Sequence, residues 1–390
     1  MNAGTITEKA GEDPDAPVAP GGGPFGFWPH PAVIDRTGFK HKALSDWTFN
    51  ISVGCTHGCE FCYVPSVSAN KQAITLAGFG VTDPDGQWGR YSLLRHWDEG
   101  AFLKSLEIAE RTPAEQLSED GNRAIILCST TDPYQTFGGS TPEKAKILND
   151  ARRHMVRRAL ELILERSTLN VRVLTRGTLA VEDFDLYARF GDRLLFGMSV
   201  PTLDPRLTRL YEPGAPSPEA RMRVLRAAKK RGLQVFVAMA PTPPESDEAD
   251  LRRTLEAIAE LDPVTIFHEP INVRAENVAR IAARAAEIGV PFRREVFAST
   301  GSWAQYAIRQ LDQVERIADD MALLGRLKLW PDPSLADPST YVAFREHAFW
   351  GGDPPGYVAP AARRARAEGF LEDFHARFLQ IGRASCRERV

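Results

Sequence analysis

Residues 54–63 read GCTHGCEFCY and directly follow the strand-like run 47–53, WTFNISV. Cys55, Cys59 and Cys62 stand there with the spacing C-x3-C-x2-C. Three thiolates on one short loop can bind three irons of an iron–sulfur cube and leave the fourth iron without a protein ligand. Gly54 and Gly58 would let the backbone wrap closely around such a cluster. The loop therefore predicts a metal centre at the end of a strand.

Two other metal sites are compatible with the same loop. His57 could complete a Cys3His zinc site, although the loop lacks a second ligand pair at finger spacing. A closed electron-transfer cluster would need a fourth cysteine, for which Cys128 is the candidate. Under either alternative the protein would be a non-catalytic iron–sulfur or zinc-binding protein.

Strand-like and helix-like runs alternate after the cysteine loop. This order predicts an α/β fold with a parallel sheet and right-handed crossovers. A wrapped, barrel-like sheet is our first expectation and an open doubly wound sheet the second. The expected strands are 47–53, 124–130, 169–175, 193–200, 233–240 and 263–268, and the expected helices are 142–166, 217–231, 247–260, 275–288 and about 303–325.

Several residues mark the expected helix ends. Ser140 and Glu143 have capping-box spacing, and Pro142 suits the first turn of a helix. Gly232 and Gly289 follow helical runs, where a left-handed cap favours glycine.

Four segments are expected along the chain. Residues 1–24 are rich in Pro, Gly and acidic side chains and are predicted to be a disordered leader. Residues 25–290 are the expected core barrel, and 291–380 an accessory C-terminal segment. Residues 381–390, IGRASCRERV, match what one frame of a common sequencing adaptor would encode, and we interpret them as an artefactual tail.

Composition excludes several classes of protein. The 390 residues carry a formal net charge of −3, so any nucleic-acid surface must be local. No apolar run has transmembrane length, and no secretory signal is present, so we expect a cytoplasmic protein without membrane association. Three of the five cysteines lie in one short loop, which is unlike a disulfide framework.

The cysteine loop, with Phe61 as its aromatic residue, resembles the signature of the radical S-adenosylmethionine (SAM) superfamily. The runs STTDPYQ (129–135), VLTRGTLAVEDFDL (173–186), SVPTLDPRLTRLYEPGAPSPEAR (199–221) and FHEPIN (267–272) are similar to the spore photoproduct lyase-like branch. The resemblance extends from about Lys40 to Asn272. It implies a partial (β/α)6 barrel of the radical SAM type with extra N- and C-terminal segments.

The resemblance also implies a reaction. In this family SAM chelates the open iron of a [4Fe–4S] cluster, and an electron from the cluster cleaves its sulfonium C–S bond. The resulting 5′-deoxyadenosyl radical abstracts hydrogen from a substrate. The implied partners are a low-potential electron donor such as flavodoxin or ferredoxin and an unidentified substrate, for which a DNA photoproduct is one candidate. The enzyme would then be a spore photoproduct lyase-like lyase.

The same resemblance assigns roles to individual residues. Cys55, Cys59 and Cys62 would bind the cluster. Phe61 and the backbone around Tyr63 would border the adenine of SAM. Other polar residues at strand ends could instead cap the following helices. By resemblance, Thr130, Ser199 and Arg176 would contact SAM, and Arg176 stands where relatives often carry a lysine. The further polar residues at strand ends are Thr131, Asp132, Thr175, Thr202, Glu269 and Asn272.

Cys128 stands near the position of the hydrogen-donor cysteine of the lyases. Three residues separate it from Asp132, one more than the resemblance leads us to expect, and Phe61 stands where a tyrosine is expected. A small buried thiol is the alternative role of Cys128.

The basic run from Arg221 to Arg231 is predicted to be a solvated helix face. Because the basic residues are dispersed among acidic ones, we expect weak or no binding to undamaged duplex DNA at physiological salt.

Overall fold

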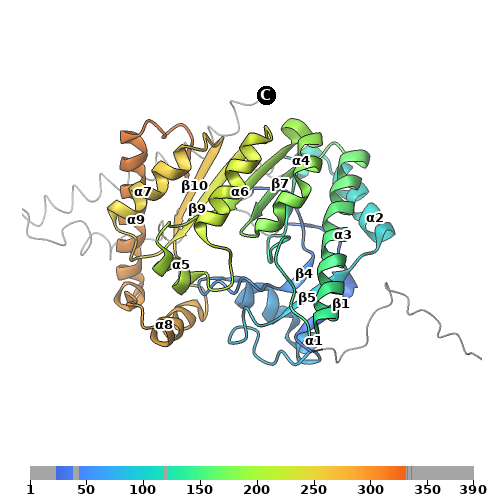
Figure 1. The fold of residues 1–390 in the computed structure, drawn as a ribbon, viewed down its shortest axis with the longest axis horizontal. Coiled ribbons are helices and arrows are strands. Elements are labelled where there is room, and N and C mark those ends of the chain that lie inside the picture. The colour runs from blue at the N-terminus through green and yellow to red at the C-terminus, as the bar shows by residue number, and fades with distance from the viewer. Residues whose placement is uncertain (1–22, 38–43, 118–121, 331, 333–334, 336–390) are drawn as a thin grey trace, which may run out of the picture.

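Two sheets organise the computed structural model, which describes residues 23–37, 44–117, 122–330, 332 and 335. The main sheet has eight strands in the order β11-β10-β9-β8-β7-β6-β3-β2, and a small sheet has the order β1-β5-β4 (Figure 1). Main-sheet neighbours from β3 to β11 pair in parallel, whereas β2 pairs antiparallel with β3. The predicted α/β fold with a parallel sheet is confirmed. The predicted tail 381–390 and most of the predicted leader lie outside the described residues.

The strands are short, as in most α/β barrels. In the main sheet they are β2 (Ile34–Arg36), β3 (Trp47–Phe49), β6 (Ala124–Leu127), β7 (Asn170–Thr175), β8 (Leu194–Ser199), β9 (Val235–Thr242), β10 (Thr265–Pro270) and β11 (Leu327–Leu329). The small sheet contains β1 (Phe25–Pro31), β4 (Ser52–Gly54) and β5 (Ser92–His96).

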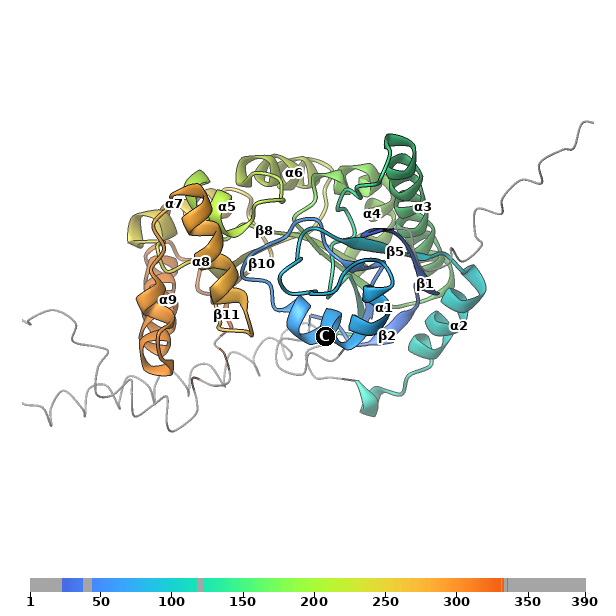
Figure 2. The ribbon, with the colours of Figure 1, turned by 90° about the horizontal axis from the view of Figure 1, so that it is seen from below.

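Helices connect successive strands. They are α1 (Ala73–Ala77), α2 (Glu99–Glu110), α3 (Pro142–Arg166), α4 (Phe184–Phe190), α5 (Pro205–Tyr211), α6 (Pro218–Lys230), α7 (Glu248–Ala259), α8 (Asn277–Ile288) and α9 (Thr300–Asp320). Single turns of 3-10 or π type occur at Pro65–Ala69, Asn70–Gln72, Ala114–Gln116, Thr178–Asp183, Gly191–Arg193 and Arg294–Phe297. Seen from the end where the small sheet lies, α3, α4, α6, α5 and α7 follow one another around the strands (Figure 2).

The predicted helix ends are largely correct. α3 begins at Pro142, but its N-cap is Thr141, whose side chain accepts a hydrogen bond from the backbone N–H of Lys144 at 3.2 Å. The capping-box interpretation of Ser140 was therefore wrong by one residue, because Thr141 also carries a hydroxyl suited to capping. Gly289 caps α8 in the left-handed conformation with φ 65°, as predicted.

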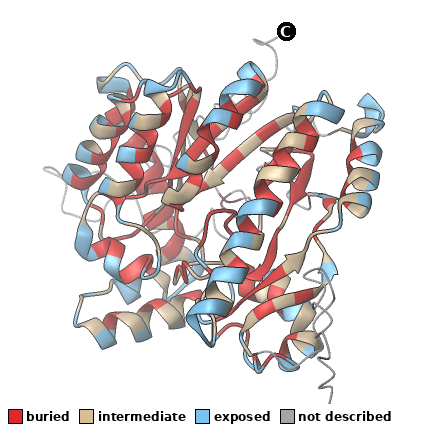
Figure 3. Ribbon diagram, turned by 45° about the vertical axis from the view of Figure 1, so that its right-hand side comes forward, coloured by how far each residue is buried: buried red, intermediate tan, exposed pale blue. Residues whose placement is uncertain are grey.

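One face of the main sheet forms the large core. In β7, Val171, Val173 and Thr175 are buried while the alternate residues are half-buried. The buried valines join residues of α3, α6, α7 and α9 in one hydrophobic cluster. The helices bury the sides that face the sheet and expose the opposite sides (Figure 3). The buried faces of the strands, which repeat every second residue, and the buried faces of the crossover helices thus pack together in one layer.

The predicted first strand, 47–53, is divided between the two sheets. β3 pairs with β6 in the main sheet, and β4 pairs antiparallel with β5 in the small sheet. Between them the side-chain oxygen of Asn50 accepts hydrogen bonds from the backbone N–H groups of Ser129 and Thr130, at 2.9 and 3.0 Å. These bonds replace the sheet ladder, so the chain leaves the main sheet before the cysteine loop begins.

Elements beyond residue 290 join the sheet. β11 pairs in parallel with β10, and Trp303, Tyr306 and Leu311 of α9 belong to the large hydrophobic cluster. Within the described part of the chain, no helix is both long and apolar enough to cross a membrane.

Candidate functional site

The cysteine loop directly follows β4 and lies against the segments that contain Gly89, Tyr91 and Gly214. Gly54 and Gly58 have φ of +91° and +54°. A Cβ atom on Gly54 would lie 2.4 Å from the carbonyl oxygen of Tyr91, and one on Gly58 would lie 2.9 Å from Cα of Gly89. Both positions therefore require glycine, for backbone conformation and for space.

Polar side chains beside β4 hold the first half of the loop. Gln135 accepts a hydrogen bond from the backbone N–H of Thr56 at 2.8 Å. Its amide nitrogen donates to the hydroxyls of Ser52 and Thr131 at 3.0 and 2.7 Å. The hydroxyl of Thr131 in turn donates to the carbonyl of Gly54 at 2.7 Å. The end of β6 thus fixes the loop where it leaves β4.

The segment between α5 and α6 holds the second half. The backbone N–H of Gly214 donates to the carbonyl of His57, and that of Glu60 donates to the carbonyl of Tyr211, both at 3.0 Å. A Cβ atom on Gly214 would lie 2.3 Å from the carbonyl oxygen of Thr56. The backbone at Gly214 therefore approaches the cysteine loop so closely that only glycine fits at this position.

The three loop thiols lie in a poorly solvated environment. Cys55 and Cys59 are buried and Cys62 is half-buried. Burial raises the pKa of each thiol, that of Cys59 to about 12. Negative charge on Asp132, Cys59 and Cys62 raises the pKa of Cys55 further, so the three sulfurs are near enough to interact. Thiolates at these positions require a compensating positive charge such as iron, so the donor set fits an iron–sulfur cluster.

The arrangement does not suit a single metal ion. Across the described residues, no three His, Cys, Asp or Glu side chains converge on a point where one ion could be held. Nδ1 of His57 instead lies 3.4 Å from a carboxylate oxygen of Asp132. His57 is thus directed to Asp132 in the described part of the chain and not to a centre shared with the three cysteines. A cube differs because each thiolate binds its own iron, so the sulfurs need not converge on one point.

Asp132 joins the ends of β6 and β7. Its carboxylate accepts hydrogen bonds from the hydroxyl of Thr175 at 2.7 Å and from the backbone N–H groups of Tyr134 and Arg176, both at 2.8 Å. The carboxylate of Asp132 thus fixes the segment after β6 against the end of β7.

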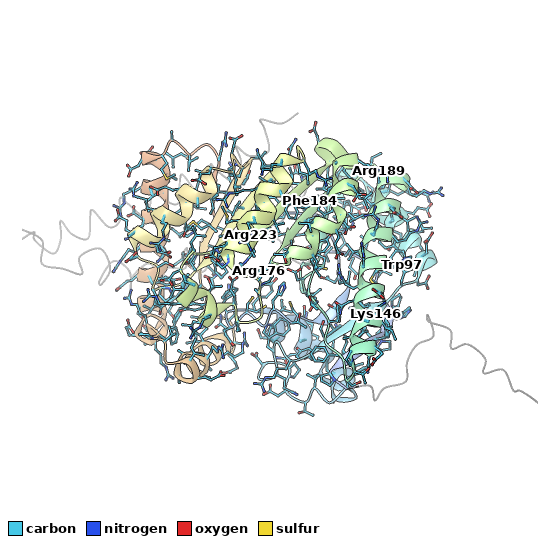
Figure 4. All side chains as sticks on the ribbon, viewed as in Figure 1. Trp97, Lys146, Arg176, Phe184, Arg189 and Arg223 are labelled. Atoms are coloured by element: carbon cyan, nitrogen blue, oxygen red, sulfur yellow. The ribbon has the colours of Figure 1, made fainter. Side chains whose placement is uncertain are left out.

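A buried ion-pair network lies beside the cysteine loop. Glu212 pairs with the guanidinium groups of Arg176 and Arg221. Burial opposes ionisation of Glu212, but the two guanidiniums outweigh it and lower the pKa of Glu212 to about 2. Arg176 lies near the middle of the molecule, whereas Arg223 is on the outward side of α6 (Figure 4). The carboxylate of Glu212 therefore holds the permanently charged guanidinium of Arg176 within the site.

Most of the predicted SAM-contact residues come together around this network. The guanidinium carbon of Arg176 lies 5.4 Å from the centre of the Phe61 ring. Arg221 donates to the carbonyl of Ser199 at 2.7 Å. The hydroxyl of Tyr63 donates to the carbonyl of Ser129 at 3.2 Å, next to Thr130.

Two predicted residues are directed elsewhere. The thiol of Cys128 donates to the carbonyl of Phe49 at 3.3 Å and packs in the large hydrophobic cluster. Its φ of +63° is unusual for a non-glycine residue. The hydroxyl of Thr202 donates to Asp250 of α7 at 2.8 Å, so Thr202 braces the crossover to α7.

Several residues of the site carry no local signal in the sequence that places them there. Arg221 was expected on a solvated face, but its side chain is fully buried. That expectation was wrong because α6 directs the side chain of Arg221 toward Glu212. The run of basic residues does not by itself indicate which of them is buried. Asn277 and Arg280 of α8 also reach the loop, donating to the carbonyls of Phe61 at 3.2 Å and Cys62 at 2.5 Å.

Comparison with known proteins identifies related chains. The family model described as the radical SAM superfamily matches residues 49–258. An uncharacterised protein of Acidianus two-tailed virus is 32% identical over 62% of this chain and 72% of its own length. Uncharacterised proteins of Mycobacterium tuberculosis and Methanocaldococcus jannaschii are 23% and 20% identical, over 51% and 72% of this chain and 50% and 89% of their own lengths.

Solved structures of spore photoproduct lyase share the fold. One variant has a TM-score of 0.52 and 12% sequence identity, over 78% of this chain and 81% of that chain. A structure complexed with the dinucleoside spore photoproduct has a TM-score of 0.50 and 14% identity, over 75% of this chain and 78% of that chain. At such identities the likeness shows the fold alone.

Proposed function

The chain belongs to the radical SAM superfamily, and on this premise we propose that it reductively cleaves SAM at a [4Fe–4S] cluster held by Cys55, Cys59 and Cys62. When bound, the cluster and SAM would supply a 5′-deoxyadenosyl radical for hydrogen abstraction from the substrate. The observation that carries the proposal is the set of three poorly solvated thiols on one loop, of which two are buried and one is half-buried. Three ligands leave one iron of a cube open to SAM.

The residues around the loop are suited to bind the polar and aromatic parts of SAM. Arg176 offers a permanent cation for the carboxylate of SAM, and Glu212 orients this guanidinium. Phe61 offers a ring surface to the adenine and the backbone around Tyr63 borders it, and Thr130 and Ser199 are proposed to complete the contacts. Burial of the site excludes water, which strengthens these electrostatic contacts.

The substrate proposal is narrower and rests on the solved neighbours. A spore photoproduct lyase has been solved in complex with its dinucleoside photoproduct. We extend this to a DNA photoproduct as substrate here, with Cys128 as hydrogen donor. For that role the thiol must leave the carbonyl of Phe49 and turn toward the site. A low-potential flavodoxin or ferredoxin would supply the electron.

Anaerobic reconstitution tests the proposed function. The reconstituted chain should hold about four irons and release 5′-deoxyadenosine from SAM under dithionite. A chain that is purified anaerobically with zinc, and that shows no iron-dependent absorbance, would overturn the proposal. Turnover of the dinucleoside spore photoproduct, lost in Cys128→Ala while SAM cleavage persists, would support the narrower substrate. Absence of turnover in the wild type would reject it.

A further inference from the structure

Helix α8 holds the end of the cysteine loop, although more than 200 residues of sequence separate them. The side-chain amide of Asn277 donates to the carbonyl of Phe61 at 3.2 Å, and Arg280 donates to the carbonyl of Cys62 at 2.5 Å. The two side chains stand three residues apart and therefore share one face of the helix. These contacts thus hold the guanidinium of Arg280 against the backbone of Cys62.

Arg280 is also an ionic link to the segment between α1 and β5. Its guanidinium pairs with the carboxylate of Asp85, and its Nε lies 4.0 Å from a carboxylate oxygen of Glu60. The side chains of Arg280 and Asp85 are only 10% and 11% exposed. Charges buried to this extent are weakly screened by solvent, so each is felt strongly by neighbouring charges.

The charge of Arg280 lies beside the cysteine loop, since its guanidinium contacts the backbone of Cys62 and faces the carboxylate of Glu60. A cation held at this place stabilises negative charge on the loop thiolates and on a cluster that they bind. Reduction of an iron–sulfur cluster adds one negative charge, and nearby net charge is among the factors that set its potential.

Resting on the proposed cluster, we propose that Arg280 is a positioning residue that fixes Cys62 and, with Asp85 as its counterion, sets the cluster's reduction potential. Arg280 favours the reduced cluster and Asp85 opposes it. The two side chains therefore act with opposite sign on the potential, although both connect the same segments.

The test is a potentiometric titration of the reconstituted full-length chain, followed by the electron paramagnetic resonance signal of the reduced cluster without SAM or substrate. Arg280→Gln should shift the midpoint potential to more negative values, and Asp85→Asn to less negative values. Arg280→Lys keeps the charge and should stay close to the wild type. Arg284→Gln is the matched control, one turn further along α8, where Arg284 pairs with Glu287 at 2.9 Å.

A purely structural clamp predicts a different result. Both Arg280→Gln and Asp85→Asn would then lose iron, with unchanged potentials or with shifts of the same sign, and either result overturns the proposal. If Arg280→Gln holds no cluster, the sign of the shift in Asp85→Asn still decides. A wild-type chain without a cluster would overturn the proposed function itself, whereas a normal cluster with unshifted variants would reject this inference alone.

Discussion

Replacing Glu212 with glutamine would remove the shared counterion of two arginines at the centre of the site. Its carboxylate pairs with Arg176 and Arg221, and the side chain is 1% exposed. Arg176 and Arg221 overcome the effect of burial and lower the pKa of Glu212 from its ordinary 4.5 to about 2. A depression of roughly 2.5 corresponds to about 3 kcal/mol of folding free energy at neutral pH.

An independent argument gives a similar value. Removing one partner of a buried ion pair typically costs about 3–5 kcal/mol, because the remaining charge is left without compensation. We therefore expect Glu212→Gln to lower the free energy of unfolding by about 3 kcal/mol at pH 7. Because the pKa of Glu212 is depressed on folding, this contribution is present above about pH 4.5 and is lost as the pH falls toward 2.

Urea unfolding of the full-length chain, followed by tryptophan fluorescence, measures this difference. Glu260→Gln is the control, because Glu260 pairs with Arg226 at 3.3 Å while the two side chains are 69% and 49% exposed. An exposed pair contributes at most about 1 kcal/mol. Equal slopes of free energy against urea in wild type and variants would show that the comparison is valid. A loss in Glu212→Gln no larger than in Glu260→Gln would refute the reasoning.

Three further predictions concern the loop and the core. Cys59→Ala should abolish cluster assembly and SAM cleavage, while Cys128→Ala retains both; loss of the cluster in Cys128→Ala, measured by iron content, would identify it as a ligand. Gly214→Ala should destabilise the chain by about 1–3 kcal/mol in urea unfolding, because its Cβ would lie 2.3 Å from a carbonyl oxygen of the cysteine loop. Gly325→Ala, which meets nothing within 4 Å, is its control and should be nearly neutral. Burial lowers the pKa of His268 from 6.5 to about 4, so the unfolded chain binds its proton first as the pH falls. Stability should drop by about 2 kcal/mol from pH 7 to pH 5, and His268→Leu should lack this component; an unchanged pH profile in that variant would contradict the assignment.

The sequence by itself determined the parallel α/β architecture and the place of the cysteine loop. The sequence predicts the strand–helix alternation, the start of α3 at Pro142 and the end of α8 at Gly289. These features are predictable because periodicity and capping depend on neighbours within one or two turns. The three cysteines were equally evident, since one short loop contains them all.

Only the tertiary structure decided which charges surround that loop. Arg221 and Arg223 stand in the same basic run, yet one is buried against Glu212 and the other is exposed. Arg280 reaches Cys62 across 218 residues of sequence. Local patterns indicate which residues can be charged or helical. An ion pair depends on where two distant segments are brought together, and that is set by packing of the whole sheet and its helices.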